Sequence, residues 1–280
     1  MARKGNDVFK QGGSAQAAIP RRDVLKDDFG FEIPVQTVPL PSKGVCYPVD
    51  SEMHGKEEVG IKAMTAREED ILTSRALIKK GTVITELLKS TIIEPGFDPD
   101  SMLSGDRNAL MITLRASGYG TEYAVEVDCP SCAARSKQSF DLSTLPIKTL
   151  EIEPVAVGAN VFETELPVTK QRVRFRFLTG RDEQEIAVLQ ERKKKQGHQM
   201  ESTITTRLQY QIVGVGDVTD KTKIGFFIRG MPARDSLHLR RFIDEHEPGI
   251  EMKSHMTCNS CYETSEVRLP LGASFFWPDA

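Results

Sequence analysis

The stretch YAVEVDCPSCAARSKQSF, residues 123–140, places Cys129 and Cys132 two residues apart between segments in which apolar and polar residues alternate. Such alternation is typical of β-strands, so the stretch predicts a hairpin with both cysteines at its turn. A C-x-x-C pair can be a redox couple, a disulfide or half of a metal site. The rest of the sequence decides which interpretation is favoured.

A second pair, Cys258 and Cys261, lies in IEMKSHMTCNSCYETSEVRLPL near the C-terminus, with the same spacing and similar flanks. When residues 101–142 are aligned with 230–271, ten of 42 positions are identical, both cysteine pairs among them. Two earlier blocks align in the same order. They are 64–72 with 178–186 and 84–93 with 204–213.

The alignment predicts an internal duplication with two insertions in the second copy. The offset between the copies rises from 114 to 120 and then to 129, which requires six extra residues near 193–202 and nine within 214–229. Insertions are tolerated best in surface loops, so we expect loops at both places.

The expected fold class is α+β, with two halves that each run strand, helices and cysteine hairpin. Thr65 and Glu68 form a capping-box pattern at a helix start, and Thr179 with Asp182 is a weaker version. In the first half we expect a strand at 59–64, helices at 66–80, 82–93 and 105–117, and then the cysteine hairpin. In the second half we expect a strand at 172–178, helices at 181–196, 200–213 and 232–246, and then the second cysteine hairpin. The predicted division is a flexible arm at 1–37, a first repeat at 38–150 and a second at 151–280.

Together the two pairs predict one structural zinc ion bound by Cys129, Cys132, Cys258 and Cys261. Zinc prefers four ligands in a tetrahedron, and each hairpin turn, a zinc knuckle, supplies two. A redox pair usually lies at a helix N-terminus, whereas these flanks resemble strands, so zinc is favoured over redox or disulfide roles. His255 is an alternative ligand without support from the first copy, and Cys46 is expected to be a packed thiol.

Composition narrows the class of protein. The chain has 280 residues and a net charge of -3, which disfavours nucleic acid as the main partner. No apolar run is long enough to cross a membrane, and no signal peptide is evident, so folding in a reducing cytoplasm is expected. Phosphate-loop, dinucleotide-binding, metalloprotease and serine-hydrolase motifs are absent, so no catalytic residues are proposed and no small-molecule substrate is expected.

The two ends of the chain are candidates for binding partners. The polar, glycine- and alanine-rich N-terminal arm is expected to become ordered against another protein. Phe275, Phe276 and Trp277 form an aromatic cluster near the C-terminus. Such a cluster either packs into the core or anchors a neighbouring protein, and we interpret it as an anchor.

Several segments together resemble the T4-type bacteriophage baseplate protein family, the hub assembly proteins of contractile tails. The resemblance spans most of residues 38–278. The segments are LPSKGVCYP (40–48), MTAREEDIL (64–72), GDRNALMITLRASGYGTEY (105–123), the two C-x-x-C pairs and the terminal FFWP. The resemblance implies a viral structural or assembly protein without catalytic activity, in the virion tail baseplate after assembly in the host cytoplasm. It also implies that the four cysteines bind zinc and that the partners are other baseplate, hub or tail proteins.

Two other classes remain as alternatives. A nucleic-acid-binding zinc-ribbon protein would share the cysteine pairs, but the near-neutral charge and the lack of basic, aromatic knuckle tips disfavour it. A zinc hydrolase needs a coordination position for water, which four thiolates would occupy.

Overall fold

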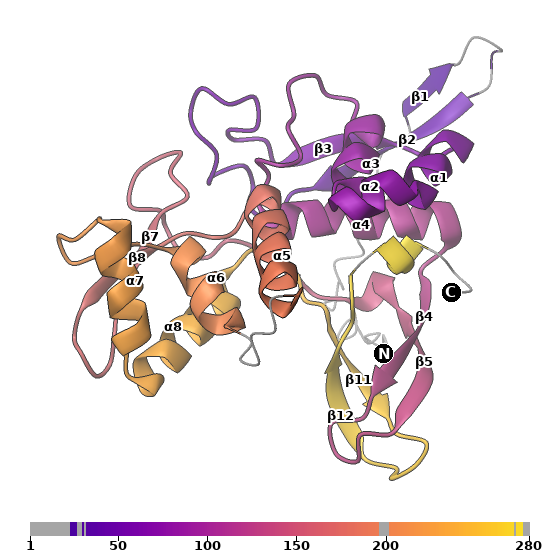
Figure 1. The fold of residues 1–280 in the computed structure, drawn as a ribbon. Helices are drawn as coiled ribbons and strands as arrows, with labels where there is room; N and C mark the ends of the chain where they lie inside the picture. The colour runs from indigo at the N-terminus through magenta and orange to yellow at the C-terminus, as the bar shows by residue number, and fades with distance from the viewer. Residues whose placement is uncertain (1–22, 27–29, 31, 196–201, 272, 277–280) are drawn as a thin grey trace, which may run out of the picture.

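The computed structural model describes residues 23–26, 30, 32–195, 202–271 and 273–276 (Figure 1). The described chain mixes helices with short antiparallel strands, which confirms the α+β class. Within it, each helix is too short or too polar to cross a bilayer.

The first half begins with an antiparallel sheet in the order β1-β2-β3 and ends with a hairpin. Its elements are β1 (Asp23–Lys26), β2 (Glu32–Pro39), β3 (Glu58–Lys62), α1 (Ala66–Thr73), α2 (Arg75–Lys80), α3 (Val83–Thr91), α4 (Ser104–Tyr119), β4 (Glu122–Asp128) and β5 (Arg135–Asp141). The helix expected at 66–80 is divided at Ser74, whose extended backbone (ψ 103°) separates α1 from α2.

The second half follows the short elements η1 (Leu142–Thr144) and β6 (Ile147–Lys148). Its elements are β7 (Phe162–Glu165), β8 (Arg172–Phe175), α5 (Gly180–Lys195), α6 (Thr203–Gln211), β9 (Ile212–Val215), α7 (Lys221–Gly230), α8 (Ala233–His246), β10 (Gly249–Ile250), β11 (Lys253–Thr257), β12 (Thr264–Arg268) and η2 (Ala273–Phe276). The stretch expected to be a loop insertion at 214–229 includes all but the last residue of α7, so that part of the expectation is wrong.

Helix starts in the two halves use the same capping chemistry. The backbone N–H of Thr65 donates to Glu68 over 2.9 Å, and that of Thr179 donates to Asp182 over 2.8 Å. In both helices the carboxylate also accepts a hydrogen bond from the threonine hydroxyl. Both predicted capping patterns are therefore confirmed, and they fix where α1 and α5 begin.

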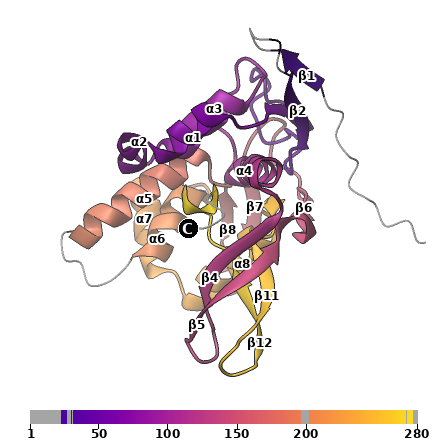
Figure 2. The same ribbon diagram turned by 90° about the vertical axis from the view of Figure 1, so that its right-hand side faces the viewer.

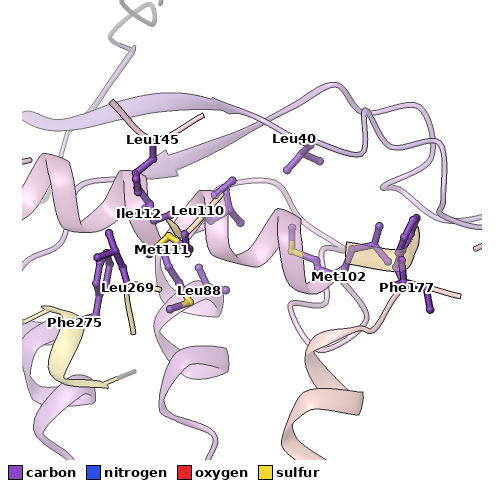
Figure 3. Packing of buried hydrophobic residues seen from close by; sticks show 14 of the residues in the cluster. Leu40, Leu88, Met102, Leu110, Met111, Ile112, Leu145, Phe177, Leu269 and Phe275 are labelled. Atoms are coloured by element: carbon purple, nitrogen blue, oxygen red, sulfur yellow. The ribbon is translucent and has the colours of Figure 1, made fainter. Parts of the chain in front are cut away.

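Helix α4 is the centre of the hydrophobic core. Side chains from distant parts of the sequence surround it, including Leu40, Leu145 and Phe275 (Figure 3). Gly105, in its first turn, lies against the backbone of Pro248, and a Cβ at this glycine would be 1.7 Å from the Pro248 carbonyl oxygen. Only a glycine allows the segment before β10 to approach α4 so closely.

The two halves share this core instead of folding separately. Strand β10 of the second half pairs with β6, placing Gly249 opposite Lys148, and η2 packs on α4. One continuous cluster of buried hydrophobic residues includes side chains from both halves. The predicted boundary at residue 150 therefore does not separate two independent cores.

The predicted arm at 1–37 needs a correction at its C-terminal end. Strand β2 begins at Glu32 and pairs with β3, and Val35 is 3 % exposed. Pairing with β3 and the burial of Val35 and Val38 stabilise this segment as a strand. Residues 1–22 of the predicted arm lie outside the described residues.

Candidate metal centre

The first cysteine pair lies at the tip of the β4–β5 hairpin, as the alternating flanks predicted. The N–H of Cys129 donates to the carbonyl of Ala134 over 2.9 Å, and the N–H of Ala133 donates back to the Cys129 carbonyl over 2.8 Å. Ala133 has a left-handed backbone (φ 58°), which closes the turn tightly. This turn directs the sulfurs of Cys129 and Cys132 toward the same point.

The second pair lies at the tip of the β11–β12 hairpin in the same geometry. The N–H of Cys258 donates to Glu263, and the N–H of Tyr262 donates to Cys258, each over 3.0 Å. Tyr262 has a left-handed backbone (φ 59°), at the position that corresponds to Ala133. The two hairpins run side by side, and their tips meet at one end of the molecule (Figures 1 and 2).

The four sulfurs form a compact group whose spacing fits one metal ion. The Cys129 and Cys261 sulfurs are 3.8 Å apart, those of Cys132 and Cys258 are 3.7 Å apart, and all four lie within 4.8 Å of one another. A tetrahedron with Zn–S bonds of ~2.3 Å has S···S edges of ~3.8 Å. A disulfide needs about 2.05 Å. All five cysteines are free thiols.

The electrostatics of the group also favour a cation. The pKa of Cys258 is lowered to about 6, chiefly because the backbone N–H groups of Cys261 and Ser260 donate toward its sulfur. The pKa of Cys132 is raised to about 12, because the neighbouring thiols oppose its ionisation more than the N–H of Ala134 favours it. Thiols this close cannot all ionise unless a positive ion compensates their charge.

Burial separates the four ligands into two kinds. Cys129 and Cys258 are 2 % and 1 % exposed, whereas Cys132 and Cys261 lie on the surface. Each buried cysteine is the first of its pair and continues the inward face of its strand. A bound ion would therefore be held between the core of the hairpins and solvent.

Polar and charged side chains near the cysteines pair with one another. The hydroxyls of Ser131 and Ser265 lie 3.4 Å apart and connect the two hairpins. Arg135 pairs with Asp128 at 2.8 Å. Lys253 pairs with Asp244 and Glu251. Each of these two cations therefore has carboxylate partners of its own.

The two residues considered beside the cluster lie elsewhere. His255 is exposed on β11 opposite Glu266 and is not part of the group of ligand atoms. Cys46 is a buried thiol, 2 % exposed, in the hydrophobic core, and burial raises its pKa to about 12. Cys46 is therefore the packed thiol that the sequence suggested.

Phe275 and Phe276 are the principal correction to the predicted sites. Both are 0 % exposed, so the structure places these rings in the core and not on a surface for a partner. Phe275 packs edge-on against Tyr123 with ring centroids 4.9 Å apart, and its carbonyl accepts a 3.1 Å hydrogen bond from Arg115. Trp277 lies outside the described residues.

Sequence reasoning missed two buried carboxylates that position loops. Asp106, 0 % exposed, accepts hydrogen bonds from the N–H and hydroxyl of Ser42, at 3.0 and 2.6 Å. Asp235 likewise accepts from the N–H groups of Val168 and Thr169, at 2.7 and 3.0 Å. The signal was present, because Asp106 and Asp235 are identical positions in the alignment of the two halves.

A family model described as "T4 bacteriophage base plate protein" matches residues 45–277, most of the chain and both cysteine pairs. The chain belongs to this family. The resemblance seen in the sequence is thereby confirmed. Membership of the base plate family indicates a structural role in the tail baseplate of a phage and contacts with other phage structural proteins. No curated protein and no solved structure gives a significant match.

Proposed function

We propose that this base plate protein is a zinc-stabilised, non-enzymatic scaffold of the baseplate hub. In this role it binds other baseplate, hub or tail proteins, first during assembly in the host cytoplasm and then in the tail of the virion. The observation that carries the proposal is the group of four thiols, contributed by two hairpins far apart in sequence and lying within 4.8 Å of one another.

Zinc is the ion best suited to this group. Thiolates are soft ligands that select zinc, copper(I) or iron–sulfur clusters, and a closed set of four cysteines is typical of structural zinc. With all four positions filled by sulfur, no position remains for a water or a substrate, which supports a scaffold over a hydrolase. The ion would join the two halves at a point where each hairpin is only two strands wide.

We further infer that the two halves arose by duplication. The strand pairing supports this: β3 pairs antiparallel with the strand before it in the first half, as β8 does in the second, and Val59 and Val173 differ by the aligned offset of 114. The helices α3 and α6 have the same length, nine residues, at the offset of 120 that the sequence alignment requires. The hairpin turns have equivalent hydrogen bonds as well. Duplication explains how one chain supplies two matching knuckles.

The experiment that tests the proposal measures metal content and assembly together. We expect purified protein to hold about one zinc per chain by elemental analysis, and Cys129→Ser or Cys258→Ser to lose it. Structural zinc contributes about 10–16 kcal/mol of apparent binding free energy in finger peptides, so each variant should also unfold at the hairpins. Cys46→Ser, away from the cluster, is the matched control and should retain the zinc.

Assembly is read out by complementing a phage that lacks this protein. The wild type and Cys46→Ser should restore complete baseplates, and the two knuckle variants should not. Two zinc ions per chain, iron in place of zinc, or a Cys129–Cys132 disulfide under reducing conditions would each contradict the single zinc site. Normal baseplates from a metal-free variant would contradict its role in the scaffold.

A further inference from the structure

Three exposed valines form an apolar patch on two loops that pack together. Val49, Val155 and Val157 are 66 %, 58 % and 82 % exposed. Gly158 joins the loops, because a Cβ at this position would lie 3.0 Å from a methyl group of Val49. We call residues 151–157 together with Val49 the valine loop. Clustered exposed apolar side chains of this kind usually mark an interaction surface.

The valine loop is held in shape and carries negative charge. The N–H of Val155 donates to Val161 over 2.7 Å, and the N–H of Ala159 donates to Ala156 over 3.1 Å. Glu151 and Glu153 are exposed beside the valines, and neither forms an ion pair with another described residue. A preformed loop loses little conformational entropy when it binds, so this surface is suited to docking as a unit.

A groove of complementary character lies along the exposed side of α8. It has a volume of about 440 Å³, and Pro167, Leu237 and Phe242 provide its apolar lining. Leu237 is 40 % exposed. Arg234 and Arg241 flank the groove, are exposed, and form no ion pair within the part of the chain that the structure describes. His238 and Glu245 complete the lining.

We propose that the valine loop of one copy of this chain docks into the α8 groove of a second copy. The valines would cover Leu237 and Phe242, while Glu151 and Glu153 would face the two unpaired arginines. Charge and apolar character therefore match on both sides.

Within one chain the two surfaces lie at opposite ends of β7, since the valine loop precedes Phe162 and Pro167 follows Glu165. A contact between two different surfaces is head-to-tail, so each copy keeps a free loop and a free groove. Such contacts build rings when the rotation closes and filaments when it does not.

Sedimentation equilibrium of the full chain across a range of concentrations tests the contact. The wild type should self-associate, and Val157→Asp or Leu237→Asp should each weaken the association constant by roughly tenfold or more, as central interface residues do. Both positions are exposed, so the variants should keep the wild-type circular dichroism spectrum. Ile78→Asp, at an apolar position on α2 that is 47 % exposed, is the control and should associate like the wild type.

Mixing the two variants tests the head-to-tail geometry directly. Val157→Asp retains an intact groove and Leu237→Asp retains an intact loop, so an equimolar mixture should form a one-to-one dimer and nothing larger. Arg241→Glu should weaken association, and adding Glu153→Arg should restore it. A wild type that stays monomeric at its solubility limit, variants that associate normally, or a mixture without dimer would overturn the proposal. The measurement involves neither zinc nor other phage proteins, so its failure leaves the scaffold role untouched.

Discussion

Replacing Phe275 with alanine should destabilise the folded protein and leave its partner surfaces unchanged. The ring is fully buried and lies against α4 in the centre of the core (Figure 3). Its centroid is 4.9 Å from the ring centroid of Tyr123 and 5.5 Å from that of Phe276. Transfer of a phenylalanine side chain out of water is worth about 1.5–3 kcal/mol. The cavity and the lost ring contacts bring typical costs of Phe→Ala to about 3–5 kcal/mol.

We expect a loss of about 3 kcal/mol in the free energy of unfolding, at the low end of this range. Helix η2 is a short 3₁₀ segment of four residues and can move partway into the space left by the ring. The assay is urea denaturation followed by circular dichroism, with zinc held in excess so that metal binding is constant. Phe226→Ala is the control: Phe226 is 65 % exposed on α7, with the Arg229 guanidinium 4.8 Å from its ring centroid, and its loss should change the free energy of unfolding by no more than about 1 kcal/mol.

The contrary result would restore the interpretation of the aromatic cluster as an anchor. If Phe275→Ala costs less than about 1 kcal/mol and yet prevents incorporation into baseplates, the ring acts at an interface and the burial argument fails. The double variant of Phe275 and Phe276 should cost a different amount from the sum of the single changes, because their rings are in contact.

Two further predictions concern a buried carboxylate and the N-terminus. Burial raises the pKa of Glu68, but hydrogen bonds from Ser90, Thr65 and Lys62 lower it by more, to about 2, against 4.5 ordinarily. The ionised Glu68 therefore stabilises the fold fully above pH 4.5, and this stabilisation is lost as the pH falls toward 2. In Glu68→Gln the melting temperature should fall less steeply between pH 4.5 and 2 than in the wild type. An equal slope of melting temperature against pH in the two proteins would refute the assignment. We also propose that residues 1–22 bind another baseplate chain. Deleting them should leave a folded protein with its full zinc content that complements poorly, and normal complementation would show that they are dispensable.

Local patterns in the sequence predicted the two hairpins, the starts of α1 and α5, and the grouping of the four cysteines. Alternation, capping residues and C-x-x-C spacing act over a few neighbouring residues, so they can be recognised without knowing what packs around them. The second C-x-x-C pair also indicated that the other half of the metal site lies more than a hundred residues away in the sequence. The alignment of the two halves also contained the identical pair Asp106 and Asp235, a signal of their shared role that sequence reasoning did not use.

The tertiary structure alone decided which surfaces are covered. The sequence FFWP does not indicate whether the aromatic rings face solvent or α4. The packing of η2 on α4 shows that Phe275 and Phe276 lie in the core. The strand at Glu32–Pro39 likewise depends on pairing with β3. The ion-pair partners of Arg135 and Lys253 depend on which carboxylates the fold places beside them. The burial of a side chain and the pairing of a strand depend on residues that are distant in the sequence, so local sequence patterns do not specify them.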